Sequence, residues 1–154
     1  MAFTYDQLKT AIQDYTQNTE TSFVTNLPIF IRSAEERILK TVQLTLFRKN
    51  STGNMTQGDE FLIMPTDFLS PFSLSFTDAS NDKKFCDFKS VNFIQSFNPD
   101  RTLTGEPRYY ASFDSTSFII GPTPNDSYSV ELHYFYRPAS ITAGAGSGET
   151  WLSQ

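Results

Sequence analysis

Residues 118–138 read FIIGPTPNDSYSVELHYFYRP and indicate two strands joined by a turn. Pro122 and Pro124 stiffen the middle of the segment, and the Asn-Asp pair that follows them is typical of turns. Because side chains alternate along a strand, one face of the second strand reads V-L-Y-Y over residues 130–136 and the other reads E-H-F-R over residues 131–137. The pattern predicts a β-hairpin with one apolar face and one wetter face.

The segments before this one also favour antiparallel β structure from residue 51 onward. SLSFT (73–77) and KKFCDF (83–88) alternate around the turn DASND, which predicts a hairpin. RYYASF (108–113) and SFIIG (117–121) flank a second turn, DST. SVNFIQSF is a short helical candidate near residues 90–97.

Two helices are predicted before residue 50. In the first, Thr4 is the expected N-cap and Gln7 its capping-box partner. The second is expected over 28–42 with Pro28 in its first turn, after a polar linker over 18–26. The residues expected on its apolar face are Phe30, Ile31, Ala34, Ile38 and Val42. Its other face carries Arg32, Glu35, Glu36 and Lys40. QLTLF (43–47) switches to a period of two, and STGNMTQGDE (51–60) is rich in turn residues.

Helices followed by antiparallel strands predict an α+β fold rather than alternating βαβ units. We expect a helical part over 1–50 and an antiparallel β part over 51–138, built as hairpins or as a small sandwich or barrel. The tail over 139–154 is rich in small residues, which predicts a flexible arm.

Composition supports a folded chain of 154 residues that is acidic overall. The 15 Phe and 7 Tyr can build a core without much aliphatic content. The net charge is −5, with +1 over residues 1–50 and −6 over the remainder. This balance excludes the basic footprint of a nucleic-acid-binding protein, and it is compatible with a surface past which DNA slides.

Several functional classes lack the residues that they need. Cys86 is the only cysteine, which excludes an internal disulfide and a thiolate metal cluster. One histidine and one cysteine leave only carboxylate metal sites, no segment matches a calcium-binding loop, and the glycines over 53–58 lack the ending of a phosphate-binding loop. We expect no metal and no cofactor. No signal peptide is visible, and no apolar run approaches the 18 residues of a membrane span.

His133 is the only histidine and the first candidate for catalysis. An acid such as Glu131 or Asp126 would have to assist it in a small hydrolase, but no recognisable catalytic constellation surrounds these residues in the sequence. A half-exposed strand histidine is the simpler interpretation, and we predict that the protein is not an enzyme. An alternative binding role is recognition of a host-surface glycan by aromatic residues, for which the candidates are Tyr109, Tyr110 and Phe113.

Four segments together resemble a known family. They are LPIFIRSAEERI (27–38), MPTDFLSPFSLSF (64–76), EPRYYA (106–111) and IIGPTPNDSYSVELHYFYRP (119–138). In this order the chain is similar, over roughly residues 4–138, to the head-to-tail adaptor proteins of tailed bacteriophages, of the podovirus-type tail tubular or neck connector class. Each motif alone is weak, and the order makes the set more specific.

The resemblance implies a structural virion protein of the neck or tail, assembled in the host cytoplasm. Such adaptors form a ring, typically of twelve copies, between the portal protein and the tail nozzle. DNA passes through the ring without specific binding. Family members usually continue past a Trp-Leu segment into a portal-embracing tail, whereas this sequence ends at Gln154.

The expected contacts of such a ring fall into two sets. The mixed-charge helix face of Arg32, Glu35, Glu36 and Lys40 is the candidate inter-subunit surface, although simple solvation would explain it equally well. Trp151 and Leu152 are the candidate portal or tail contacts.

Overall fold

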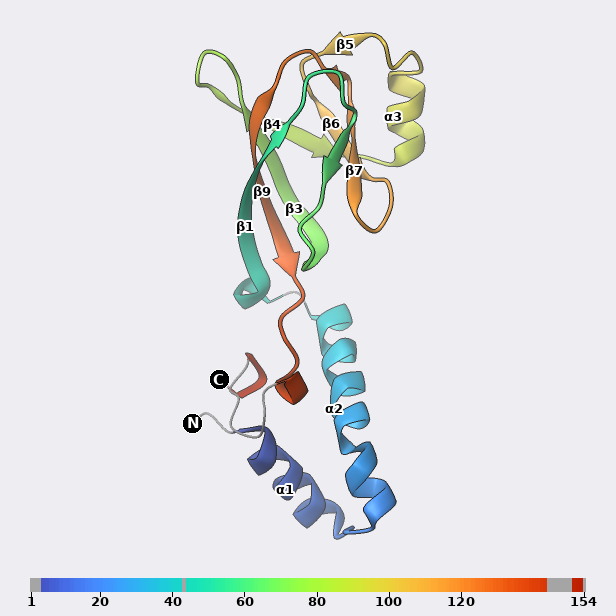
Figure 1. Cartoon of the computed structure of the whole chain (residues 1–154), viewed down its shortest axis with the longest axis vertical. Helices are drawn as coiled ribbons and strands as arrows, with labels where there is room; N and C mark the ends of the chain where they lie inside the picture. Colours follow the sequence, from blue (N-terminus) through green and yellow to red (C-terminus); the bar gives the residue numbers. More distant parts are fainter. Residues whose placement is uncertain (1–3, 43, 144–150, 154) are drawn as a thin grey trace. The chain divides into compact units, whose positions relative to one another are not determined.

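The computed structural model describes residues 4–42, 44–143 and 151–153 and confirms the α+β class. The chain divides into two compact units, Met1–Phe47 with Arg137–Gln154 and Arg48–Tyr136 (Figure 1). The helical unit contains α1 (Tyr5–Thr16), α2 (Thr21–Thr41) and three 3-10 turns, η1 (Thr45–Phe47), η2 (Ile141–Ala143) and η3 (Trp151–Ser153).

The β unit contains nine strands and one helix among the described residues. They are β1 (Arg48–Met55), β2 (Phe61–Ile63), β3 (Phe68–Thr77), β4 (Lys83–Phe88), α3 (Val91–Phe97), β5 (Thr104–Gly105), β6 (Tyr109–Ser112), β7 (Ser117–Gly121), β8 (Thr123–Pro124) and β9 (Tyr128–Tyr136).

The capping box predicted for α1 is confirmed. The Gln7 backbone N–H donates to Thr4 Oγ1 at 3.3 Å, and the Thr4 N–H donates to Gln7 Oε1 at 2.9 Å. Both bonds satisfy N–H groups that a helix start leaves without partners. The small core of this unit consists of Tyr5, Ile31 and Ile141, with Leu8, Ile12 and Leu152 packed against it.

The second helix begins earlier than the sequence predicted. It starts at Thr21, so the linker expected over 18–26 is limited to residues 18–20, and Pro28 lies inside the helix. Hydroxyl and amide side chains of the early turns donate to carbonyls four residues back, as Thr25 does to Thr21 and Asn26 to Ser22. Pro28 has no N–H to donate within the helix, and its neighbour Leu27 is buried.

The buried face of α2 also differs from the expected one. Leu27, Ile31, Glu35 and Leu39 are buried, whereas Phe30, Ala34 and Val42 are exposed. Burial at every fourth position is helical, so the predicted period is correct, but Ile31 is the only residue of the predicted apolar face that is buried. The buried stripe includes a carboxylate because the C-terminal segment packs against it.

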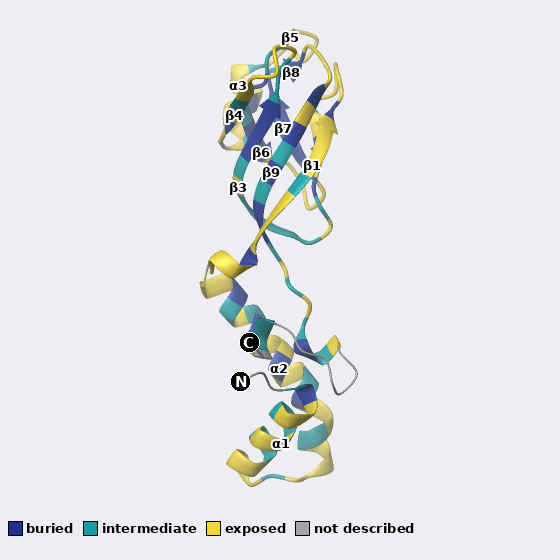
Figure 2. Cartoon of the chain, turned by 90° about the vertical axis from the view of Figure 1, so that its left-hand side faces the viewer, coloured by how far each residue is buried: buried dark blue, intermediate teal, exposed yellow. Residues whose placement is uncertain are grey.

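Seven strands of the β unit form one sheet in the order β1-β9-β3-β4-β6-β7-β2. All neighbours are antiparallel except β4 and β6, which are parallel. The outermost strands β1 and β2 also contact each other, so the sheet curls into a nearly closed barrel. Figure 2 shows the buried residues gathered along β7 and β9. Closure of this kind reduces the unpaired edges that invite aggregation.

The predicted hairpin over 118–138 is wrong in its pairing. β9 pairs with β1 and β3, and β7 pairs with β6 and β2. The intervening residues form β8, which pairs in parallel with β5. Alternation in the sequence reports which face of a strand is buried and does not report its partner. The predicted apolar face is correct at Val130, Leu132 and Tyr134, which are buried, but Phe135 on the predicted wetter face is buried as well.

Other sequence predictions have mixed outcomes. The hairpins β3–β4 and β6–β7 and the helix α3 are confirmed. Residues 45–47 form η1 instead of a strand, and Gln43 lies outside the described residues. The first half of the turn-rich stretch, residues 51–55, belongs to strand β1, whose polar side chains gave no apolar alternation to detect. Within the expected arm over 139–154, residues 144–150 and 154 also lie outside the described residues.

Substituting Gly121 by Ala tests how closely α3 packs on β7. An added Cβ would lie 2.9 Å from Ile94 Cγ2, which is too close for two carbon atoms. We expect Gly121→Ala to lower the free energy of unfolding by about 1–3 kcal/mol, because the buried Ile94 must move. Gly53→Ala is the matched control, since its Cβ would lie an ordinary 3.6 Å from Val130 Cγ2. Urea unfolding of both variants measures the difference, and equal stability would show that α3 moves freely.

Candidate assembly site

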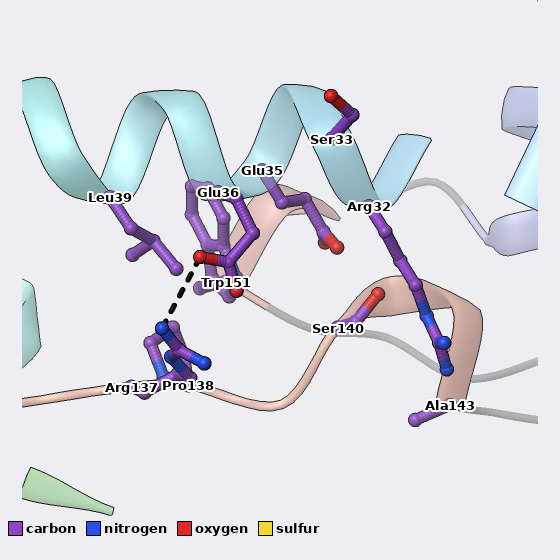
Figure 3. Close-up of a pocket in the computed structure, with 10 residues that line it drawn as sticks. All are labelled: Arg32, Ser33, Glu35, Glu36, Leu39, Arg137, Pro138, Ser140, Ala143 and Trp151. Carbon is purple, nitrogen blue, oxygen red and sulfur yellow. Dashed lines mark hydrogen bonds and ion pairs between the residues drawn. The ribbon is translucent and has the colours of Figure 1, made fainter. Parts of the chain in front are cut away.

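A pocket of about 420 Å³ lies in the helical unit between α2 and the C-terminal segment (Figure 3). The residues that line it are Arg32, Ser33, Glu35, Glu36, Leu39, Arg137, Pro138, Ser140, Ala143 and Trp151. The pocket therefore brings three of the four predicted inter-subunit residues together with Trp151, which the sequence alone had placed in a separate set.

Glu35 is the most deeply buried charged side chain that the structure describes, with 3% of its surface exposed. Its Oε1 atom accepts a hydrogen bond of 3.0 Å from the backbone N–H of Ile141. This bond fastens the C-terminal segment to α2 across 106 positions of sequence. The expectation that Glu35 belongs to a solvated helix face is consequently wrong.

Two further bonds hold the same segment on α2. Arg32 Nε donates to Thr142 Oγ1 at 2.9 Å. Arg137 forms an ion pair of 3.3 Å with Glu36, which Figure 3 marks with a dashed line. Both interactions lie at the surface, so each contributes little to stability. They chiefly fix the position of the C-terminal segment on α2.

Trp151 lines the pocket close to α2, beside Glu36 (Figure 3). Its ring packs edge-on against Phe47 with 5.1 Å between the ring centres. Its neighbour Leu152 packs against the small core of the helical unit. Lys40 differs from the other predicted contact residues, because it is exposed on α2 and does not line the pocket.

The polar face of the barrel carries the candidate hydrolase residues. Glu131 pairs with Lys83 and accepts from Asn50, and it lies 3.2 Å from His133 Nε2. The hydrogen bond from Lys83, together with those from His133 and Asn50, lowers the pKa of Glu131 to about 2. A carboxylate tied to a lysine in this way is a poor proton acceptor, which disfavours a catalytic pair. His133 is half-exposed on its strand, as the simpler interpretation predicted.

The aromatic residues proposed for glycan binding do not form one surface. Tyr110 is 2% exposed and packs against Phe118 in the barrel core. Tyr109 points the other way and meets Phe93 and Phe97 of α3. Phe113 packs on Phe61 at the end of β6. Neighbouring residues of a strand face opposite sides, so Tyr109 and Tyr110 cannot act together.

Chemistry-bearing groups are otherwise sparse in the described part of the chain. Burial raises the pKa of the Cys86 thiol to about 12, so this cysteine is a core residue rather than a nucleophile. Residues 4–42, 44–143 and 151–153 contain no cluster of three His, Cys, Asp or Glu side chains suited to a metal ion. None of the helices described there has the length and hydropathy of a membrane span.

Comparison with known families identifies the group of proteins to which the chain belongs. Residues 3–154 match the profile of the SU10 adaptor protein family. The chain belongs to this family. The adaptor is therefore a structural protein of a bacteriophage virion, in agreement with the predicted resemblance, and it assembles with other head or tail proteins. No curated protein matches the chain.

Proposed function

We propose that the adaptor forms a closed homo-oligomeric ring between the portal protein and the tail nozzle, and that it extends the DNA channel. The match of residues 3–154 to the SU10 adaptor protein family carries this proposal. The resemblance of the sequence gives twelve copies as the expected number. The protein acts through the shape of its interfaces and catalyses no reaction.

Charge supports the proposed passage of DNA. The β unit has seven Lys and Arg against eleven Asp and Glu, a net charge of −4. Phosphates that pass such a surface find few cations to displace their counterions, so they do not adhere to it. A channel lining needs this property, whereas a DNA-binding protein needs the opposite.

We assign the ring's own contacts to the helical unit. Arg32, Glu35 and Glu36 meet Trp151 in the pocket, so we propose Trp151 as part of the inter-subunit set rather than as a separate portal contact. Leu152 is proposed to support it from the core of the unit. A ring needs two different complementary faces on each copy, and α2 with its C-terminal partner supplies both.

Sizing of the protein alone and with the portal protein of the same phage tests the proposal. Mass photometry is expected to show a discrete ring-sized species in the mixture, and negative-stain images should show it seated on the portal. A protein that stays monomeric at every concentration and ignores the portal would rule the proposed function out.

A further inference from the structure

The second carboxylate oxygen of Glu35, Oε2, has no hydrogen-bond partner among the described residues. Oε2 is buried and accepts no hydrogen bond from any residue in the described part of the chain. None of the ion pairs found there includes Glu35 either. Buried charges in proteins are almost always paired, because loss of hydration costs several kcal/mol per ion. The pocket therefore lacks one cation or hydrogen-bond donor at a defined atom.

The walls of the pocket indicate what kind of cation fits. Leu39, Pro138 and Trp151 offer apolar surface. The two arginines of the lining have partners other than Glu35, because Arg137 pairs with Glu36 and Arg32 donates to Thr142. A side chain with an apolar stem and a charged end matches both features, because the stem of a lysine or arginine packs along apolar surface. A small hydrated ion would leave the apolar walls uncovered.

Trp151 adds a second requirement. Its indole Nε1–H is buried and donates to no acceptor in the described residues. A lysine ammonium has donors only and cannot satisfy it. A carbonyl oxygen carried on the same segment as the cation can. A stretch of polypeptide with a basic side chain next to unpaired carbonyl groups meets both requirements.

The end of α2 has both properties. Lys40 is exposed there and forms no ion pair among the described residues. It follows Glu35 by five residues, which places it about 140° away around the helix. The last carbonyl groups of a helix lack partners within that helix, and α2 ends at Thr41. One side of α2 thus lines the pocket, and the other side carries a last turn whose chemistry matches the pocket. We call this last turn, with Lys40, the plug.

We propose that the last turn of α2 in a second copy of the chain enters this pocket, with its Lys40 ammonium on Glu35 Oε2 and a last-turn carbonyl on Trp151 Nε1. The inference rests on the proposed ring and names the contact that closes it. Each copy presents a pocket to one neighbour and a plug to the other, which is the head-to-tail arrangement that generates rings. The exposed Arg37, one turn before Lys40, adds positive charge to the plug.

Charge reversal on the exposed partner tests the contact without disturbing the fold. We expect Lys40→Glu to weaken assembly about thirtyfold or more, because it sets a carboxylate against a buried carboxylate. Lys40→Arg should retain assembly. Arg108→Glu is the matched control, since it makes the same charge change at an exposed position of the β unit. Mass photometry across a concentration series with the portal measures all three.

Glu35→Gln approaches the same contact from the other side. The glutamine keeps an oxygen for the Ile141 N–H and removes the charge, so the helical unit should keep its circular dichroism and Trp151 fluorescence. Assembly of the Glu35→Gln, Lys40→Ala and double variants forms a thermodynamic cycle. If the two residues touch, the second substitution adds little to the first.

The outcomes separate this inference from the proposed function. Assembly of the Lys40→Glu variant at the wild-type concentration would overturn the contact and leave the ring intact. Full additivity in the cycle would overturn it too, because additivity is typical of residues that do not meet. A wild-type chain that never assembles with the portal would overturn the proposed function, and this inference with it.

Discussion

Replacement of Phe118 by Ala is expected to lower the free energy of unfolding of the β unit by about 3–5 kcal/mol. Phe118 has no exposed surface, and its ring packs edge-on against Phe68 at 5.1 Å and Tyr110 at 5.4 Å. Truncation removes the transfer free energy of a whole ring and leaves a cavity. The aromatic neighbours can fill this cavity only by leaving their own packing positions.

The tyrosines allow the loss of stability to be measured for the β unit separately from the helical unit. Five of the seven lie between residues 109 and 136, so near-ultraviolet circular dichroism at the tyrosine band follows the barrel. The single tryptophan, Trp151, lies in the helical unit and follows that unit by its fluorescence. Phe85→Ala is the matched control, because Phe85 is 67% exposed and its loss should cost less than about 1 kcal/mol. Equal costs for the two variants would show that Phe118 does not belong to a closely packed core.

Replacement of Asp67 by Ala is expected to lower the free energy of unfolding by about 1–3 kcal/mol, because it leaves a buried hydroxyl without its acceptor. Asp67 Oδ1 accepts from the Tyr134 hydroxyl at 2.7 Å, and its Oδ2 pairs with Lys49 at 2.6 Å. Tyr134 is almost fully buried, so without Asp67 its hydroxyl loses its acceptor. Asp87→Ala removes a carboxylate that is 72% exposed and should change stability little.

The same pair predicts a pH dependence. The hydrogen bond from Lys49 holds the pKa of Asp67 below its usual value of 3.8, with a further contribution from Tyr134, although burial opposes them. Because the folded pKa is the lower one, this stabilisation is complete above the unfolded pKa and disappears as the pH falls through the folded pKa. The difference between wild type and Asp67→Asn should therefore shrink below about pH 4. A difference that stays constant down to pH 2 would exclude the ion pair as its source.

Much of the fold was accessible from the sequence where local chemistry determines it. Thr4 and Gln7 cap α1 through their own side chains, and alternation over 130–134 assigns the buried face of β9. The partner of β9 was not accessible, because alternation is the same whichever strand lies alongside. Strand β1 was missed because its side chains are mostly exposed and polar, and its position comes from pairing with β9.

The sequence identified residues of the candidate site, but it did not show how they are arranged in space. Arg32, Glu35 and Glu36 stood out as charges on one helix, and Trp151 as an isolated aromatic residue. Their meeting depends on a segment more than 100 positions away that packs on α2 and buries Glu35. The only sequence signal for this burial was the period of four from Leu27 through Ile31 to Leu39, which passes through position 35.

A cryo-electron microscopy map of the adaptor assembled on the portal protein, at a resolution that shows side chains, tests the proposed ring and its contact together. We expect a closed ring in which Lys40 of each copy lies in the Glu35 pocket of the next, with Trp151 Nε1 against the end of the neighbouring α2. Copies that attach to the portal without touching one another, or a ring in which the Glu35 pocket faces solvent, would refute this arrangement.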